Sequence, residues 1–217
     1  MVPRFYIMVA MWLAAQISTA AADSLTYEEG LTGERRIQSQ INSRLPRYTF
    51  VLQFGESAMV EEIRIFRGNG QSPVQLLRPE CTEAPFRGSK YFQVVDLNGD
   101  GYRDISLLSW WGVQGNEGSN IWLFDPPTGT FKYDSQLSEE INVQPVLGKP
   151  CVKTFSKGGW QNENYSESKL CYRRAGWIKV WEHQRVREDA EQFVERTFEL
   201  RGGKWVRTRE AHVRDEE

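Results

Sequence analysis

The chain has 217 residues, of which 29 are acidic and 27 are basic, so its formal net charge is −2 at pH 7. Because the two signs nearly cancel, the composition indicates neither a nucleic-acid partner nor an anionic membrane surface. Aromatic residues make up 12% of the chain, and its length is sufficient for one domain with a substantial core or for two small ones.

Residues 1–22 have the pattern of a cleavable signal peptide. Arg4 precedes an apolar run over residues 5–15, and the small residues Ala20 and Ala22 suit cleavage before Asp23 or after Ala20. The apolar run is shorter than the roughly twenty residues that a membrane-spanning helix needs. No cysteine lies directly after this run to accept a lipid anchor. We therefore expect an exported, soluble protein of the periplasm.

Residues 23–47 are polar and carry little pattern. Ile37, Ile41 and Leu45 recur at helical spacing, which fits a linker or a short helix. From residue 48 onward, short apolar or alternating runs between turns that contain Gly and Pro indicate about ten short strands. The sequence therefore predicts a single all-β domain over residues 48–210, with antiparallel strands in a sandwich or propeller-like arrangement. Residues 211–217 are charged and are expected to form a frayed tail.

The stretch DLNGDGYRD, residues 96–104, has the ligand spacing of a calcium loop, because alternate positions of a tight loop can direct oxygen atoms at one cation. The predicted ligands are four side chains and one backbone carbonyl, namely Asp96, Asn98, Asp100, the carbonyl group of Tyr102, and Asp104. Gly101 stands where the chain must turn sharply, and glycine adopts positive φ without steric cost. Leu107 occupies the position of the bidentate glutamate of an EF-hand. We therefore expect a shorter kind of calcium loop that joins two strands.

The alternative for this stretch is an Asx-rich turn that binds nothing. Three carboxylates within nine residues repel one another unless a cation or solvent separates them, which favours the metal site. The ligand set consists of oxygen atoms alone, which favours calcium over magnesium.

Three cysteines, Cys81, Cys151 and Cys171, follow the signal peptide. In an oxidising compartment one pair should close and leave one cysteine over. Cys151 and Cys171 flank a polar, glycine-containing stretch almost symmetrically, as cross-strand partners in a hairpin would. We predict a Cys151–Cys171 disulfide, with pairings through Cys81 as the alternatives.

The calcium loop is followed by a second pattern, a hairpin of the form W-x-F-D-x-x-T-G-x-F. Its residues are Trp122, Phe124, Asp125, Thr128, Gly129 and Phe131. With the flanking strands, this combination resembles a family of periplasmic bacterial proteins similar to the I-type lysozyme inhibitors and to VirB-associated immunity proteins against peptidoglycan hydrolases. The resemblance is strongest over residues 91–133. It implies a propeller-like all-β fold with one bound calcium ion and no catalysis.

The resemblance also implies a loop that enters the sugar-binding cleft of a lysozyme. In the family this loop contains serine and glycine and leads to a tyrosine. The matching residues here are Ser156, Gly158, Gly159, Trp160 and Tyr165. In such a loop, Tyr165 would donate its hydroxyl group to the catalytic carboxyl group of the target, Ser156 would add a second hydrogen bond, and Trp160 would fill a sugar subsite. The alternative is a mobile hairpin tip with Tyr165 packed beneath it.

The sequence leaves three functions open. The first is an exported inhibitor of a peptidoglycan hydrolase, including the role of an immunity protein. The second is an integrin-like, calcium-stabilised adhesion or scaffold module, and the third is a cell-wall glycosidase in which two acidic residues meet in space. The sequence has no nucleophile, zinc-ligand or phosphate-loop motif, so we expect a protein that is not an enzyme.

Overall fold

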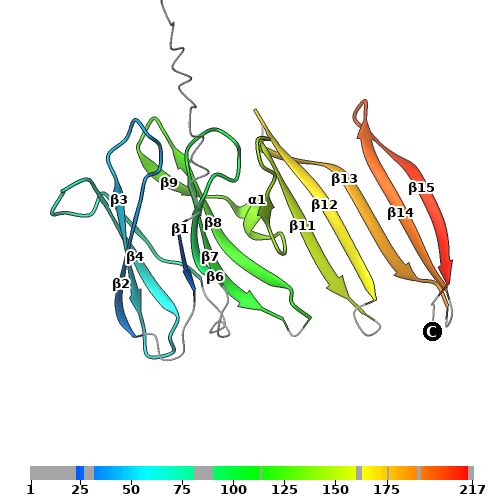
Figure 1. The fold of residues 1–217 in the computed structure, drawn as a ribbon, viewed down its shortest axis with the longest axis horizontal. Coiled ribbons are helices and arrows are strands. Elements are labelled where there is room, and N and C mark those ends of the chain that lie inside the picture. Colours follow the sequence, from blue (N-terminus) through cyan, green and yellow to red (C-terminus); the bar gives the residue numbers. More distant parts are fainter. Residues whose placement is uncertain are drawn as a thin grey trace, which may run out of the picture.

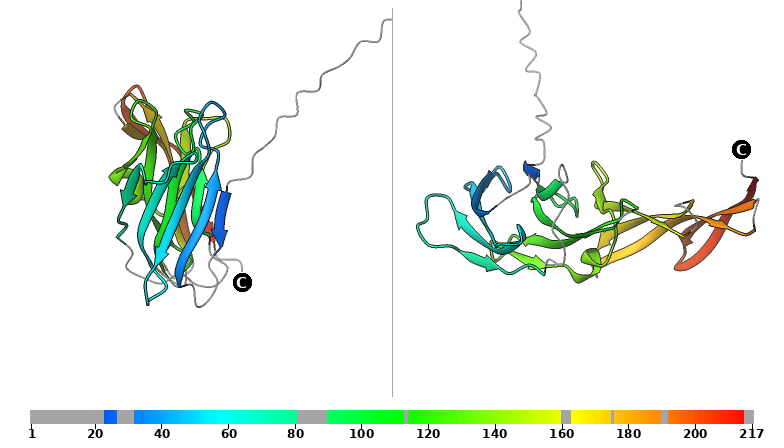
Figure 2. Two further views of the ribbon diagram at one scale, coloured as in Figure 1. Left: turned by 90° about the vertical axis from the view of Figure 1, so that its left-hand side faces the viewer. Right: turned by 90° about the horizontal axis from the view of Figure 1, so that it is seen from below.

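The computed structural model describes residues 23–26, 32–80, 90–112, 114–159, 163–174, 176–189 and 192–214, so the predicted signal peptide lies outside the described residues. The described residues form three antiparallel sheets and one short helix, α1 (Ser135–Ser138). The prediction of an all-β fold is confirmed. The sheets follow one another along the molecule rather than closing into a barrel (Figures 1 and 2).

Each sheet is built mainly from consecutive strands. The N-terminal sheet has the order β2 (Gly33–Ser39), β3 (Tyr48–Phe54), β4 (Val60–Arg67), β5 (Gln75–Leu77). The middle sheet has the order β1 (Asp23–Thr26), β6 (Lys90–Val95), β7 (Asp104–Trp111), β8 (Glu117–Asp125), β9 (Thr130–Tyr133). The C-terminal sheet has the order β10 (Gln144–Pro145), β11 (Cys151–Gly158), β12 (Asn164–Arg173), β13 (Gly176–Arg187), β14 (Gln192–Arg201), β15 (Lys204–Arg214).

The main core lies between the N-terminal and middle sheets. In β3, Phe50 and Leu52 turn inward, whereas Thr49 and Gln53 on the other face are half-buried. Val51, between Phe50 and Leu52, is also buried, so burial along the strand alternates only in part. Phe50 meets Phe92 of the middle sheet at a ring-centroid distance of 5.5 Å. The two sheets therefore form a sandwich whose inner faces supply a single hydrophobic cluster.

The middle sheet is covered on both faces along β8. Residues 120–124 of this strand are all buried, which fits its continuous apolar run better than an alternating pattern. Trp122 and Phe124 point into the main core, whereas Ile121 and Leu123 join a second cluster with Leu137 and with side chains of the C-terminal sheet. The first strands of the C-terminal sheet thus add a third layer.

The short helix α1 connects the second and third layers. Asp134 caps the helix by accepting a hydrogen bond from the Leu137 amide at 2.9 Å, and its other oxygen accepts from the indole N–H of Trp177 at 2.9 Å. Gln136 also exchanges two hydrogen bonds with the backbone of Trp177, at 2.7 and 3.1 Å. These contacts fix the start of β13 beside the middle sheet.

The segments flanking the predicted domain differ from expectation. Residues 23–47 contain strands β1 and β2 where we expected a linker or a short helix, and Ile41 is a core residue. β2 pairs with β3 on one side only and is mostly exposed, so its sequence shows no alternating pattern. At the other end, β15 continues to Arg214, within the segment that we expected to be frayed.

Candidate functional site

The predicted metal loop connects β6 to β7 at the edge of the main core. Gly101 has φ +84°, as the sharp turn requires, and Gly99 has φ +70°. The loop is fixed from outside because Asn42 donates a hydrogen bond to the carbonyl of Gly101 at 2.8 Å. The amide of Arg103 donates to the carbonyl of Ile41 at 3.0 Å. The N-terminal segment therefore supports the loop.

Within the loop, the side chains at alternate positions organise the backbone. Asp96 accepts hydrogen bonds from the amides of Gly99 at 2.7 Å and Gly101 at 3.0 Å. Asn98 accepts from the amide of Asp100 at 3.0 Å, and Asp100 accepts from the amide of Tyr102 at 2.8 Å. These are Asx-type contacts, which satisfy the tight turn and leave the carboxylates further lone pairs.

Asp104 is fully buried below the loop, and its two oxygens accept hydrogen bonds from the amides of Leu97 at 2.8 Å and Phe124 at 2.9 Å. Burial raises the pKa of Asp104 to about 8, although these two amides lower it, and the charges of Asp100 and Asp96 raise it further. Burial also raises the pKa of Asp96, with a smaller contribution from Asp100. Burial and mutual repulsion therefore disfavour the charged form of these carboxyl groups, and a bound cation would favour it.

The donor set of the loop fits a hard cation. The predicted ligands are all oxygen donors, and each carboxylate oxygen that accepts one amide can accept a second partner. Among the described residues, no group of three or more His, Cys, Asp or Glu side chains gathers closely enough to hold a metal by itself. A bound calcium ion would therefore also need the amide oxygen of Asn98 and the carbonyl of Tyr102.

The loop is in close contact with the base of the β11–β12 hairpin. A Cβ atom on Gly99 would lie 2.8 Å from the backbone nitrogen and Cα of Pro150, so this approach requires glycine. Pro150 immediately precedes Cys151, and its carbonyl accepts a hydrogen bond from the amide of Tyr172 at 2.7 Å. The metal loop and the hairpin are thus in backbone contact.

The same hairpin contains the predicted disulfide. Cys151 and Cys171 lie directly opposite each other on β11 and β12 and are bonded, with a sequence separation of 20. The prediction of this pair is confirmed, and Cys81 lies outside the described residues.

The hairpin tip is shorter than the loop from Ser156 to Tyr165 that the resemblance implies. β11 extends to Gly158 and β12 begins at Asn164, because polar side chains on both strands continue the ladder. Ser156 pairs with Ser166, and their hydroxyl oxygens are 2.9 Å apart. Gly159 has φ +58° at the turn, and Trp160 lies outside the described residues.

Tyr165 therefore lies within a strand of the hairpin. Its ring packs against Phe155 at 5.9 Å, and its hydroxyl group is 3.3 Å from Nε2 of His183. His183 in turn stacks on Trp181 at a centroid distance of 6.2 Å. These residues were not grouped from the sequence, although Trp181, His183 and Arg185 at alternate positions of β13 could have indicated one face of a strand.

Comparisons with known proteins identify a solved structure of similar fold. No protein-family model and no curated protein matches the sequence. A solved structure described as a Xanthomonas type IV secretion system related protein is similar, with a TM-score of 0.60 and 15% identity. The similarity covers 87% of this chain and 99% of that chain, so it supports the fold. In the described part of the chain, no helix has the length and hydrophobicity required to cross a membrane.

Proposed function

We propose that this protein is exported to the periplasm, binds calcium through residues 96–104, and inhibits a peptidoglycan hydrolase of the lysozyme type with the tip of the β11–β12 hairpin. The observation that carries the proposal is the contact of the metal loop with the base of this hairpin, at Gly99 and Pro150. A disulfide secures the same base. A hairpin held in this way loses less conformational entropy when it docks than a free loop would.

The tip offers groups that suit a narrow cleft. A Cβ atom on Gly158 would meet no other atom within 4 Å, so the backbone at this position is accessible to a partner. Ser156, Gly159, Trp160 and Tyr165 complete the proposed inhibitory element, with Tyr165 reaching its target only if its hydroxyl exchanges His183 for the carboxyl group of the hydrolase. The similar secretion-related structure is compatible with a protein that acts outside the cytoplasm.

A turbidity assay tests the inhibitory function. Peptidoglycan is mixed with lysozymes of several classes and with this protein, and protection of turbidity is expected for one class. Gly158→Asp should abolish protection without unfolding, because its φ is ordinary and space is open around it. Gln71→Asp, which adds the same charge at an exposed turn of the N-terminal sheet, is the matched control. Equal protection by Gly158→Asp and wild type would place the inhibitory surface elsewhere.

Thermal melting tests the calcium site independently. Extracellular calcium sites bind at about 10⁻⁴ to 10⁻³ M, and a tenfold excess over the dissociation constant adds about 1.4 kcal/mol of stability. Asp100→Ala should lower the melting temperature and remove its response to calcium. A wild-type melting curve that a chelator leaves unchanged would exclude the site. Calcium-dependent melting without protection of peptidoglycan would favour the adhesion or scaffold module.

A further inference from the structure

One face of the C-terminal sheet carries a contiguous group of aromatic rings without a covering layer among the described residues. Residues directly opposite each other on neighbouring strands project from the same face. The register therefore places Phe155, Tyr165, Trp181 and His183 together on one side of β11, β12 and β13. We call this side the aromatic face. Val152, Leu170 and Trp177 project from the other side and pack against the middle sheet.

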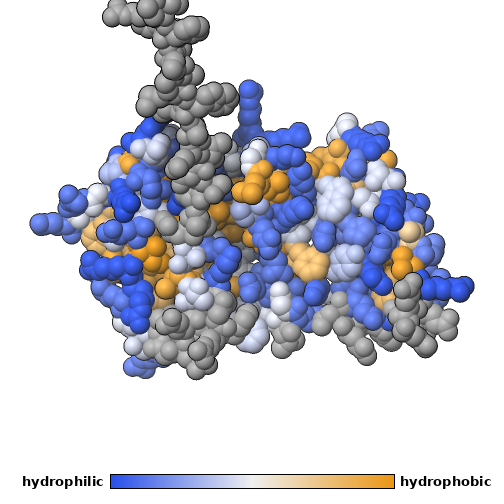
Figure 3. Space-filling model, in the orientation of Figure 1, coloured by the Kyte–Doolittle hydropathy of each residue, from blue (hydrophilic) through white to orange (hydrophobic). Residues whose placement is uncertain are grey.

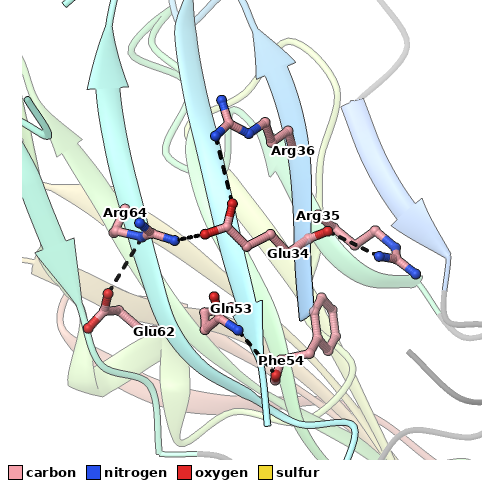
Figure 4. A network of polar contacts seen from close by, with 7 residues as sticks. All are labelled: Glu34, Arg35, Arg36, Gln53, Phe54, Glu62 and Arg64. Carbon is pink, nitrogen blue, oxygen red and sulfur yellow. Dashed lines mark hydrogen bonds and ion pairs between the residues drawn. The ribbon is translucent and has the colours of Figure 1, made fainter. Parts of the chain in front are cut away.

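A solvated sheet face is normally polar, and the outer face of the N-terminal sheet follows this rule. There Arg64 pairs with Glu34 and lies 3.6 Å from Glu62, while Arg36 lies 3.7 Å from Glu34 (Figure 4). The aromatic face differs, because its rings touch one another in sequence from Phe155 through Tyr165 and His183 to Trp181. Such a continuous row of partly exposed rings indicates a binding surface.

The aromatic face is hollowed at two adjoining places. One hollow of about 490 Å³ is lined by Asn142, Gln144, Lys153, Phe155, Glu167 and Trp181, among others. A second hollow of about 380 Å³ shares Lys153 and Trp181 and extends to Lys169 and Glu199. Ligand sites typically measure roughly 300–1,000 Å³. Two linked hollows on either side of Trp181 suit an extended chain of ring-shaped units.

The wall of the larger hollow is fixed in advance. Asn142 donates a hydrogen bond to the carbonyl of Phe155 at 2.7 Å. Asn116 exchanges two hydrogen bonds with the backbone of Lys157, at 2.7 and 2.9 Å. The side chains of Asn116 and Asn142 thus fix the free edge of β11, where this strand extends past its short partner β10. Less ordering is then required when a ligand binds.

The chemistry of the aromatic face favours a carbohydrate over a protein. The centre of a protein interface is depleted of charged residues, whereas here Lys153, Glu167 and Lys169 alternate with the rings. A sugar ring has an apolar C–H face that stacks on an aromatic side chain and a rim of hydroxyl and amide groups that hydrogen-bond to polar side chains. On β11 and β12 this face carries three lysines, at positions 153, 157 and 169, against one carboxylate, Glu167. This excess of positive charge suits a glycan polymer that carries carboxylates.

We infer that the aromatic face binds the N-acetylated glycan strands of peptidoglycan, with Trp181 and Phe155 as stacking platforms and the lysines as partners of carboxylates on the polymer's stem peptides. This activity goes beyond hydrolase inhibition, and its stacking platforms and lysines lie outside the proposed inhibitory element, which shares only Tyr165 with the aromatic face. It would retain the protein at the polymer on which the hydrolase acts.

Co-sedimentation with insoluble peptidoglycan sacculi tests this inference, together with titration by a soluble N-acetylglucosamine tetramer followed through tryptophan fluorescence. Wild-type protein is expected to bind both. The pair Phe155→Ala/Trp181→Ala should bind each at least about tenfold more weakly, since each lost ring removes a stacking contact. Trp205→Ala is the matched control, because Trp205 is 45% exposed on β15 and pairs with Leu200 outside the aromatic row. Far-ultraviolet circular dichroism checks the fold of each variant.

A second variant separates the contribution of the lysines to binding from that of the aromatic rings. Lys153→Gln/Lys169→Gln should weaken binding to sacculi and leave binding to the neutral tetramer unchanged. Unchanged binding to sacculi would overturn the assignment of the lysines to the polymer's carboxylates. Absence of wild-type binding to both probes, or full binding by Phe155→Ala/Trp181→Ala, would overturn the inference as a whole. Loss of hydrolase inhibition by that variant, without glycan binding by wild type, would assign the face to a protein partner. Because Gly158→Asp tests the tip alone, failure of either proposal is recognisable separately.

Discussion

The two ends of this molecule hold their strands together by different means. In the sandwich, the N-terminal and middle sheets cover each other, so Phe50, Phe92, Ile105 and Leu107 are completely buried. In the C-terminal sheet, β14 and β15 pack chiefly on each other and on β13, and they lie at the end of the molecule farthest from the sandwich (Figure 1).

Charged side chains substitute for a second layer at that end. The guanidinium groups of Arg185 and Arg187 lie 4.2 and 5.0 Å from the ring centre of Phe193, which is completely buried. On the side shown in Figure 3, hydrophobic patches over the C-terminal sheet are small and separated by hydrophilic residues. The C-terminal sheet thus buries Phe193 under its own charged residues and leaves other rings, such as that of Trp181, partly exposed.

The largest expected effect contrasts the same truncation in the two regions. Phe50→Ala should lower the free energy of unfolding by about 3–5 kcal/mol, because it leaves a cavity between two sheets. Phe155→Ala should cost only about 1 kcal/mol, since it removes a cross-strand contact on an open face. Urea denaturation of both variants measures the difference. Similar losses would show that the aromatic face is covered as well as the main core is.

The disulfide should contribute the next largest effect. Replacing both cysteines, as Cys151→Ser/Cys171→Ser, removes a link across a sequence separation of 20 and should lower stability by about 3 kcal/mol on the chain-entropy model. Urea denaturation under non-reducing conditions gives this value. Reduced wild-type protein is the control and should match the double variant. A loss below about 0.5 kcal/mol would indicate that the ladder of β11 and β12 constrains the hairpin without the bond.

The pH dependence of metal-free protein should reveal the buried carboxyl group of Asp104. Its pKa is about 8 in the folded state and about 3.9 in an unfolded chain. Between these values the folded state holds a proton that the unfolded state has released, so stability falls as pH rises, by about 1.4 kcal/mol per pH unit. Calcium should flatten this slope by stabilising the carboxylate. Melting curves from pH 4 to about 8, in chelator and in calcium, measure this dependence of stability on pH. Asp104→Asn, which cannot titrate, is the control.

The smallest effect is expected on the outer face of the N-terminal sheet. Arg64 and Glu34 are 32% and 40% exposed, so their ion pair is screened by solvent. Glu34→Gln should cost about 0.5 kcal/mol or less and should lose this effect at high salt. Chemical denaturation at low and at high salt measures the loss of stability under each condition. A larger, salt-independent loss would mean that the network holds the edge strand β2 in place.

The sequence predicted those features that depend on local chemistry. Positive φ at Gly101 and the pairing of Cys151 with Cys171 follow from turn and hairpin geometry. The close approach of Gly99 to Pro150 could not be predicted, because it joins two sheets that are distant in the sequence.

Strand boundaries were missed where the strands have little apolar periodicity. β2 is an edge strand, and the hairpin from Ser156 to Ser168 has polar residues on both faces. The helical spacing of Ile37, Ile41 and Leu45 arose because Ile41 and Leu45 lie beyond the end of β2, where they pack on the main core. A regular spacing of apolar residues indicates that one face of a strand or helix is covered. These segments have no such regular spacing.

The most direct test of the account is the rate of peptidoglycan clearing by a lysozyme as this protein is added in increasing amounts, with calcium and with chelator in parallel. The hydrolase alone in each buffer is the control. We expect clearing to stop near equal molar amounts in calcium. More protein should be needed in chelator, because the predicted metal loop then no longer holds the base of the β11–β12 hairpin. Clearing at the same rate with and without the protein, for every lysozyme class, would contradict it.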